Sequence, residues 1–273
     1  PELREGGGEV ELARTGSLPD LVDLPDLRGC FHCHTTWSDG TASVSQMAEG
    51  ALALGWRYLG IADHSQNAGY AGGLSSAQVR RQQREIAEWN RRRGSELRLF
   101  SGVEADILAD GSLDYSAEPG VLESFDYVIG SVHSLFRMER SEMTRRMRRA
   151  VSDPRLTMLG HARGRLLLIR DGYDVDLDAV IDAAAEAGAI IEINADPHRL
   201  DMSWQHWPHA RSRGVRTSIN PDAHSVTGLR TVRYGVVMAR KAWLTKADVL
   251  NSWELPEVED YLAARRRKRE EAR

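Results

Sequence analysis

Short apolar runs alternate along the chain with longer stretches in which apolar positions follow a helical spacing. The helical spacing predicts helices over 43–54, 76–93, 139–151, 176–187 and 203–213. The short β-rich runs predict seven strands, within 28–34, 58–64, 97–104, 126–133, 156–161, 189–194 and 215–220. Strands that alternate with helices are typical of βαβ units and a mainly parallel sheet. Seven such strands can curl into a barrel, so the pattern predicts an α/β fold.

The ends of these strands carry the candidate chemistry. Six of the seven finish on, or run directly into, residues able to bind a metal, and the exception ends at Asn194. In parallel α/β folds the C-terminal ends of the strands meet on one face, and that face holds the functional site. Residues far apart in the sequence are therefore expected in one cleft. The candidate ligands are His32, His34, Asp39, His64, Glu104, His133, His161, Asp222 and His224.

Imidazole and carboxylate groups in one cluster suit Zn²⁺, Mn²⁺ or Fe²⁺. Nine ligands are too many for a single ion, so we expect two or three ions with at least one bridging carboxylate. A lone His-x-His pair such as His32 and His34 is more often a half-buried strand with polar tips, since short motifs match by chance. Coincidence at six strand ends is a much weaker explanation, and the whole set favours a metal cluster.

The composition is that of a globular protein. Of 273 residues, 41% are hydrophobic and 28% are charged, and the chain is long enough to bury a sizeable core. No apolar run approaches a membrane span and no signal peptide opens the chain, so we expect a cytoplasmic protein. Cys30 and Cys33 form a C-x-x-C pair. Three positions apart in a strand, their thiols would face opposite sides, so we expect reduced thiols without a redox role.

The net charge is −4, yet the arginines are concentrated in three segments, 80–93, 145–149 and 265–273. Such runs are usually solvated helix faces. They also suit a polyanion, whose binding depends on local charge more than on net charge. The sequence leaves both interpretations open.

The motifs around the candidate ligands resemble those of a known superfamily. "FHCHTTWSDG", "IADHS", "GVEADI", "GSVHS", "LGHARGRLL" and "PDAHS" are similar to successive motifs of the polymerase and histidinol phosphatase (PHP) superfamily. The chain most resembles the C-terminal PHP domain of bacterial family X DNA polymerases. Residues 1–26 are similar to the linker that follows the polymerase domain there, and 27–273 to the PHP phosphoesterase domain. Ala162 and Pro221 depart from the family pattern beside two ligands, without removing either.

The resemblance implies a distorted seven-stranded (β/α) TIM-like barrel with a trinuclear metal site at the C-terminal ends of the strands. It implies Mn²⁺ and/or Zn²⁺ as cofactors, with iron as a further candidate. One metal would be held by His32, His34, Glu104 and Asp222. Glu104 would bridge to a second metal, which His133 and His161 also hold. The third would be held by Asp39, His64 and His224.

The resemblance also implies a metal-dependent phosphodiesterase that acts on DNA. The expected reaction is 3′→5′ exonuclease cleavage, with processing of 3′ ends and abasic sites in DNA repair. Expected partners are the 3′ ends of single-stranded or gapped DNA and a polymerase domain on the same full-length chain. We expect a cytoplasmic, nucleoid-associated protein without membrane contact and without polymerase activity in this chain alone. A small-molecule phosphatase, such as a histidinol phosphatase, is the alternative. A structural module with a decayed site is disfavoured because all nine ligands are present.

Several residues near the ligands have expected roles in catalysis. Glu104 and Asp222 are the catalytic carboxylates, since they would hold and bridge the metals. Arg165 and Arg199 follow ligand-bearing strands and are candidate phosphate clamps, with surface loop residues as the alternative. Trp37 would either stack on a base or pack within its loop. Asp63 would orient ligands or cap its strand.

Overall fold

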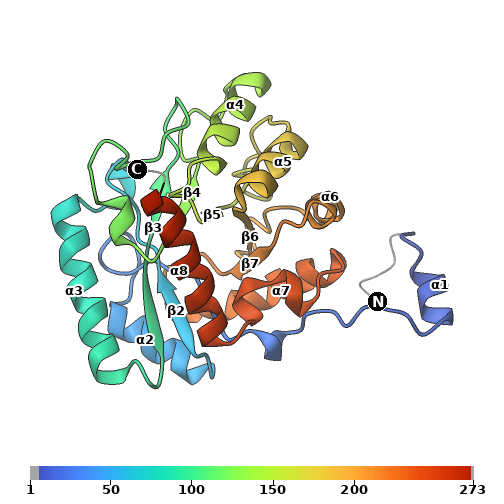
Figure 1. The fold of residues 1–273 in the computed structure, drawn as a ribbon, viewed down its shortest axis with the longest axis horizontal. Coiled ribbons are helices and arrows are strands. Elements are labelled where there is room, and N and C mark those ends of the chain that lie inside the picture. Colours follow the sequence, from blue (N-terminus) through green and yellow to red (C-terminus); the bar gives the residue numbers. More distant parts are fainter. Residues whose placement is uncertain (1–5, 272–273) are drawn as a thin grey trace.

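The structure is a computed structural model that describes residues 6–271, with side chains up to residue 267. Seven parallel strands lie side by side in chain order, and helices surround them (Figure 1). This confirms the predicted α/β barrel. The strands are β1 (Gly29–Cys30), β2 (Tyr58–Ile61), β3 (Arg98–Asp106), β4 (Tyr127–Ser131), β5 (Met158–Leu159), β6 (Ile190–Asn194) and β7 (Thr217–Asn220).

The barrel closes between its first and last strands through the residues that follow them. The amide of His34 donates to the Ala223 carbonyl at 2.8 Å, and the Ala223 amide donates to the His32 carbonyl at 3.2 Å. Cys33 and Ala223 thus form a parallel bridge instead of a long ladder. The predicted strand 28–34 forms a regular ladder only over β1. This short seam brings the first pair of candidate ligands beside the last pair.

Four of the five predicted helices begin and end near the expected positions, and two of them begin at caps that are explicit in the sequence. Ser43 and Ser75 each cap a helix and form a capping box with the glutamine three residues later. The predicted helix 203–213 is divided into a 3₁₀ turn and a short α-helix. The helices are α1 (Glu9–Arg14), α2 (Val44–Ala53), α3 (Ser76–Arg93), α4 (Arg140–Val151), α5 (Leu177–Ala187), α6 (Trp207–Ser212), α7 (Val232–Lys241) and α8 (Leu255–Glu271). The 3₁₀ turns are Leu24–Asp26, Gly69–Ala71, Leu122–Ser124, Trp204–His206, Thr227–Thr231, Lys246–Asp248 and Leu250–Ser252.

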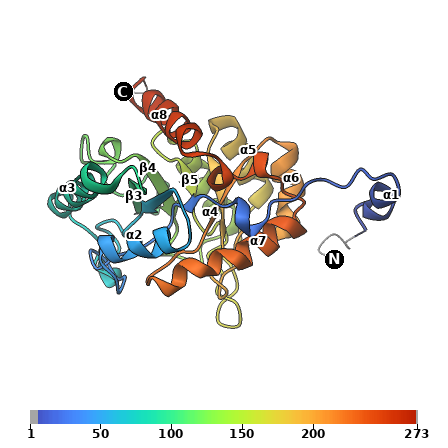
Figure 2. The same cartoon turned by 90° about the horizontal axis from the view of Figure 1, so that it is seen from below.

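The N-terminal segment is divided between the barrel and a separate short helix. Val22 is fully buried, and its amide donates to the Leu244 carbonyl at 3.0 Å. Val22 thus contacts the barrel although it precedes residue 27, and the domain boundary at residue 27 stays a prediction. α1 has no buried residues and lies to one side of the barrel in Figures 1 and 2. The linker role of residues 1–26 stays a prediction, and residues 1–5 lie outside the described part.

The barrel interior is apolar at the N-terminal ends of the strands and polar at the C-terminal ends. Alternate residues of a strand point to the same side, and β3 shows the gradient with Phe100, Gly102 and Glu104 in succession. The apolar half contains the buried side chains of Phe31, Tyr58, Phe100, Tyr127, Ile129, Met158 and Ile190. α8 packs Val258 and Leu262 against this cluster and closes that end of the barrel (Figure 2).

Two buried arginines of the basic segments have structural roles. Arg146 is 1% exposed, and its guanidinium donates to the carbonyls of Leu108 and Ser134, each at 2.9 Å. Arg265 is 5% exposed and donates to the Ala187 carbonyl at 2.8 Å. Neither is a solvated residue available to a polyanion. Residues 268–273 of the third segment lie outside the described side chains.

The two cysteines differ from expectation in orientation. Both are buried and reduced, but their sulfur atoms lie 3.4 Å apart instead of on opposite sides. The reason is that β1 ends at Cys30, so strict strand alternation does not reach Cys33. Burial in the core raises the pKa of the Cys33 thiol well above its usual value.

Tyr127 fills the barrel axis because two neighbouring strands carry glycine where its ring passes. Its hydroxyl donates to the Phe31 carbonyl at 2.5 Å, which ties β4 to the first strand. A Cβ atom at Gly102 would overlap the Tyr127 ring, and one at Gly60 would overlap the hydroxyl. These glycines are required for space, since neither has a positive φ.

We predict that Gly102→Ala destabilises the protein by about 1–3 kcal/mol, because the added methyl group must displace the Tyr127 ring in a packed interior. Urea unfolding followed by circular dichroism measures the change. Gly69→Ala is the matched control, since a Cβ there meets no atom within 4 Å. Equal stability of the two variants would contradict the packing argument.

Candidate metal centre

The Glu104 carboxylate is the centre of the polar face. It is 1% exposed and comes from the end of β3. Its Oε2 lies 3.3 Å from His32 Nε2, 3.5 Å from His34 Nε2 and 3.1 Å from His64 Nδ1. Its Oε1 lies 3.3 Å from His133 Nε2 and 2.9 Å from His161 Nε2. Five imidazoles from the ends of four strands thus converge on one buried carboxylate.

The barrel seam brings Asp222 to the same point. Its Oδ1 lies 3.2 Å from His34 Nε2 and 3.6 Å from His32 Nε2. Asp222 has a φ of 51°, a conformation that residues other than glycine seldom adopt. Asn194 donates to its other oxygen at 3.1 Å, and Arg199 Nε forms an ion pair with the same oxygen at 3.3 Å. The strained backbone and these two donors fix the direction of the carboxylate.

Asp39 completes the arrangement from the loop after β1. Its Oδ2 lies 3.4 Å from His224 Nε2 and 3.6 Å from His64 Nε2, and its Oδ1 lies 3.7 Å from His34 Nδ1. Partial burial opposes ionisation, but the hydrogen bond to His224 and the nearby histidines lower the pKa of Asp39 to about 2. All nine predicted ligands are therefore gathered on one face of the barrel.

Three histidines use Nδ1 for support and leave Nε2 directed into the cluster. His32 Nδ1 lies 2.7 Å from Glu192, and His133 Nδ1 lies 2.7 Å from Asp106. His224 Nδ1 donates to the Asp222 carbonyl at 2.9 Å. A hydrogen bond at one ring nitrogen fixes the tautomer and makes the other a metal ligand.

The residues present fit a group of divalent metals. Buried ring nitrogens without a hydrogen-bond partner occur at His32 Nε2, at both nitrogens of His34, at His64 Nδ1 and at His161 Nδ1. Unsatisfied buried polar atoms are rare in native proteins, and a cation would satisfy those directed at the carboxylates. Three overlapping sets have ligand atoms within 4.8 Å of one another: His34 with Asp39, His64 and His224; His32 with His34 and Asp222; and His64 with Glu104 and His133.

These sets agree only in part with the ligand assignment that the resemblance implies. Glu104 falls in the set with His133, as expected, but His64 joins that set as well as the one with Asp39. His161 is in none of the three, although its Nε2 lies 2.9 Å from Glu104. The assignment of individual ligands to individual ions stays a prediction.

The pKa values of the histidines in the cluster differ from one another because each ring is buried beside a different set of charged neighbours. Burial, together with the neighbouring His64, lowers the pKa of His34 to about 4, so this imidazole is neutral at pH 7. Burial also acts on His133, but the carboxylates of Glu104 and Asp106 outweigh it and raise the pKa of His133 to about 9. Burial opposes ionisation of Glu104, yet the histidines around it hold its pKa well below the usual range. A cation entering the site therefore meets ionised carboxylates.

Asp63 supports the loop that carries Asp39 instead of contacting a histidine ring. It accepts hydrogen bonds from the amide and the hydroxyl of Thr35, each at 2.7 Å, and from Ser38 at 2.5 Å. Gln82 of α3 donates to it at 2.5 Å. Its predicted role as an orienting residue is thus exercised through the loop.

The two candidate phosphate clamps lie differently. Arg199 is 19% exposed, and its Nε lies 3.3 Å from Asp222, so its guanidinium borders the centre. Arg165 donates to the carbonyls of Arg199 and Leu200, the former at 2.8 Å. Arg165 therefore supports the backbone of Arg199, and its direct contact with phosphate stays a prediction. Trp37 is half-buried; its indole donates to Glu85 at 2.8 Å, and Arg81 lies over its ring.

Sequence reasoning missed Glu192 and Asp106, which orient ligating histidines. Glu192 is fully buried and accepts from His32, from the His161 amide at 2.8 Å, and from Asn194 and Asn220. Glu192 lies two residues before Asn194, and Asp106 lies two residues after Glu104. Asn194 and Glu104 are both residues that the sequence had singled out at strand ends. Alternation along β3 and β6, which places residues two apart on the same side of a strand, would have indicated them.

None of the helices within residues 6–271 has the length and apolar character needed to cross a membrane.

Comparison with known proteins gives three kinds of match. The PHP domain family matches residues 31–196. The DNA polymerase/3′-5′ exonuclease PolX of Bacillus subtilis (strain 168) is 38% identical over 262 residues, which are 96% of this chain and 45% of that protein. The chain therefore spans less than half the length of that relative. A probable phosphatase of Thermoanaerobacter sp. (strain X514) is 25% identical over 180 residues, 62% of this chain and 70% of that protein.

A solved structure shows the same fold. The histidinol phosphate phosphatase of Lactococcus lactis subsp. lactis Il1403, determined with zinc, L-histidinol and phosphate, matches with a TM-score of 0.56 at 17% identity. The match covers 78% of this chain and 93% of that one.

We predict that Glu192→Gln lowers metal affinity about 10–100-fold, the range found when a group that supports a ligand is lost. All four partners of Glu192 are N–H groups that donate to its two carboxylate oxygens. In either orientation of a glutamine side chain, its NH₂ group would face some of these donors, so the hydrogen bonds that position His32 or the His161 backbone would be lost. Competition with a fluorescent chelator measures the affinity. The exposed Glu186 of α5 provides the control Glu186→Gln. Unchanged metal affinity in Glu192→Gln would show that this contact does not position His32.

Proposed function

Because this chain belongs to the PHP domain family, we propose that it is a metal-dependent phosphodiesterase that acts on the 3′ ends of DNA. The observation that carries the proposal is the convergence of nine ligand-type side chains on the polar face, with imidazole nitrogens directed at buried carboxylates. Two or three divalent ions, Mn²⁺ and/or Zn²⁺ with iron as a further candidate, fit this donor set. In this proposal Glu104 and Asp222 hold the ions and are the catalytic carboxylates.

Bound divalent ions would supply Lewis-acid charge and lower the pKa of water for attack on a phosphate ester. The residues of the chain provide the geometry. Glu104 keeps the ion sites adjacent, since histidines approach both of its oxygens. Arg199 is held against Asp222 and presents a planar guanidinium suited to bidentate contact with a non-bridging phosphate oxygen pair.

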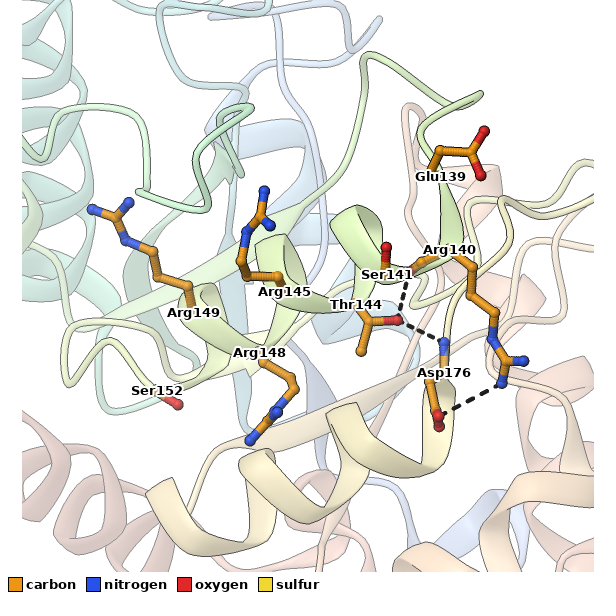
Figure 3. Close-up of a pocket in the computed structure, with 9 residues that line it drawn as sticks. All are labelled: Glu139, Arg140, Ser141, Thr144, Arg145, Arg148, Arg149, Ser152 and Asp176. Carbon is orange, nitrogen blue, oxygen red and sulfur yellow. Dashed lines mark hydrogen bonds and ion pairs between the residues drawn. The ribbon is translucent and has the colours of Figure 1, made fainter.

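A basic groove beside α4 supports DNA as the substrate. It has a volume of about 820 Å³ and is lined by Arg140, Arg145, Arg148 and Arg149, with Glu139 and Asp176 at one end (Figure 3). Among the described side chains no carboxylate pairs with Arg148, and Arg145 reaches Glu142 only at 4.0 Å. α4 begins shortly after His133, so a strand leaving the metal centre can pass this groove. Arg149 pairs with Asp110 at 2.9 Å and Arg140 lies 3.6 Å from Asp176, so Arg145 and Arg148 are the groove arginines best placed to contact a phosphate backbone.

The arginines at the end of α3 do not suit this role. α3 starts beside the metal centre, where Gln82 contacts Asp63, and Arg91–Arg93 lie near its other end, about 25 Å from its start. Arg91 and Arg92 both pair with Glu88, and Arg93 pairs with Glu49 and Glu96. Of the arginine segments that the sequence left open, we therefore assign DNA contact to α4 and not to the end of α3.

A small-molecule phosphatase is the second candidate. It is favoured by the shared fold with a histidinol phosphate phosphatase and by the probable phosphatases among the relatives. The basic groove and the higher identity to PolX favour DNA. We further propose that a polymerase domain precedes this one in the full-length protein and that this chain alone does not polymerise. The proposed substrates are gapped or single-stranded ends and abasic sites in DNA repair. We also propose that the full-length protein is cytoplasmic and nucleoid-associated.

We predict that the chain shortens a 5′-labelled single-stranded oligonucleotide in Mn²⁺ and that His34→Ala slows this reaction by about a hundredfold or more, because the imidazole contacts two metal-holding carboxylates. Gel electrophoresis of the products measures the rate. His209→Ala, on α6, is the matched control and should behave as the wild type. Rapid hydrolysis of histidinol phosphate with no cleavage of the oligonucleotide would establish the phosphatase alternative instead.

We predict that replacing Arg145 and Arg148 with glutamine weakens DNA binding and reduces the slope of log affinity against log salt by about two, roughly one unit per lost phosphate contact. Fluorescence anisotropy over a salt series measures both. Arg91→Gln with Arg92→Gln removes the same charge at the far end of α3 and should leave the slope unchanged. A reversed result, with only the α3 pair affecting the slope, would place the DNA on the other end of the barrel.

A further inference from the structure

Tyr70 lies at the rim of the metal centre. It belongs to the 3₁₀ turn Gly69–Ala71 and is 74% exposed. The centroid of its ring lies 6.2 Å from that of His64 and 6.3 Å from that of His133. Both histidines belong to one ligand set with Glu104. A large exposed ring therefore stands directly beside the ligand atoms.

Neither face of the Tyr70 ring is covered by a stacking partner. The rings of His64 and His133 meet it at 56° and 76°, so both approach at a steep angle. Within the described side chains, no cation lies over the Tyr70 ring and no hydrogen bond is made by its hydroxyl. Leu168 and Ile169 are also exposed, side by side in the loop between β5 and α5, but neither offers an aromatic face.

The loop that presents Tyr70 is firmly anchored. The Asn67 side chain donates to Asp106 at 2.7 Å, and the Asn67 amide donates to Asp114 at 2.7 Å. Ala68 and Ala71, on either side of Tyr70, are buried. Asp106 also supports His133, so one carboxylate fixes both the loop and a ligand. The ring position is thus preorganised relative to the metal centre.

We propose that Tyr70 is a stacking platform for the base of the 3′-terminal nucleotide and thereby a positioning residue for cleavage. This inference rests on the proposed function, since it needs a nucleotide at the metal centre. Aromatic stacking accepts every base because each has a π face, which suits an enzyme that removes nucleotides successively. Partial desolvation and the carboxylates of Asp106 and Glu104 raise the pKa of Tyr70, so the ring remains a neutral phenol. The indole of Trp37, for which the sequence left base stacking and loop packing open, donates to Glu85.

The test compares two substrates and four proteins, namely the wild type, two Tyr70 variants and one control variant. One 5′-labelled oligonucleotide ends in an ordinary 3′ nucleotide, and the other ends in a tetrahydrofuran residue that lacks only the base. For the wild type we expect a KM about 10–100-fold lower for the substrate with the base, the range that stacking on one aromatic ring provides. Tyr70→Ala should reduce this ratio to near one by raising KM for that substrate alone, with kcat little changed. Tyr70→Phe should keep the ratio.

Tyr234→Ala, an exposed tyrosine on α7, is the matched control and should keep the wild-type ratio. The proposal is overturned if Tyr70→Ala changes both substrates equally or neither, or if Tyr70→Phe behaves like Tyr70→Ala. Failure of the wild type to cut either oligonucleotide would instead reject the DNA phosphodiesterase function itself. The two failures are therefore distinguishable.

Discussion

The polar face of this barrel depends on the burial of one carboxylate. Glu104 is almost inaccessible to water, and the transfer of an ionised group into such an interior costs on the order of several kcal/mol unless it is compensated. Five imidazoles approach it, but neutral rings compensate a negative charge only weakly. The structure therefore requires positive charge at this point, from protonated histidines such as His133 or from bound cations. Function and stability are joined here, because the groups that stabilise the carboxylate are also the predicted metal ligands.

The apolar half of the barrel provides the support for this arrangement. Gly60 and Gly102 leave room for the Tyr127 ring, and the hydroxyl of that ring reaches the backbone immediately before His32. The position of the first ligand thus follows from packing one layer below. On the polar side, Glu192 joins His32 to the backbone of His161. One buried acid thus connects His32, after the first strand, to His161, after the fifth. This side-chain connection adds to the few hydrogen bonds of the seam between the first and last strands in holding the barrel closed.

The sequence predicted site residues correctly placed in the fold wherever one rule about parallel strands was enough. His32, Glu104, His133 and Asp222 could be predicted because parallel strands place their C-terminal ends together. Orientation within the site could not be predicted, since it depends on distant contacts such as that between His32 and Glu192. The arginine runs contain both kinds of residue: Arg146 is a buried donor to carbonyls, whereas no described carboxylate pairs with Arg148, two positions later. Arg146 lies on the face of α4 that also buries Met143 and Met147, so the spacing of the apolar positions indicates that it meets the core. The carbonyls that it binds, from loops distant in the sequence, could not be predicted in this way.

The place of α8 has a consequence for the synthesis of the protein. Val258 and Leu262, close to the end of the sequence, complete the same apolar cluster as Phe31 near its beginning. A chain emerging from the ribosome can form its βα units one after another, but the bottom of the barrel stays open until this last helix is released. The aromatic layer remains in contact with water until then, so the final compact state is reached only after translation of the domain has ended.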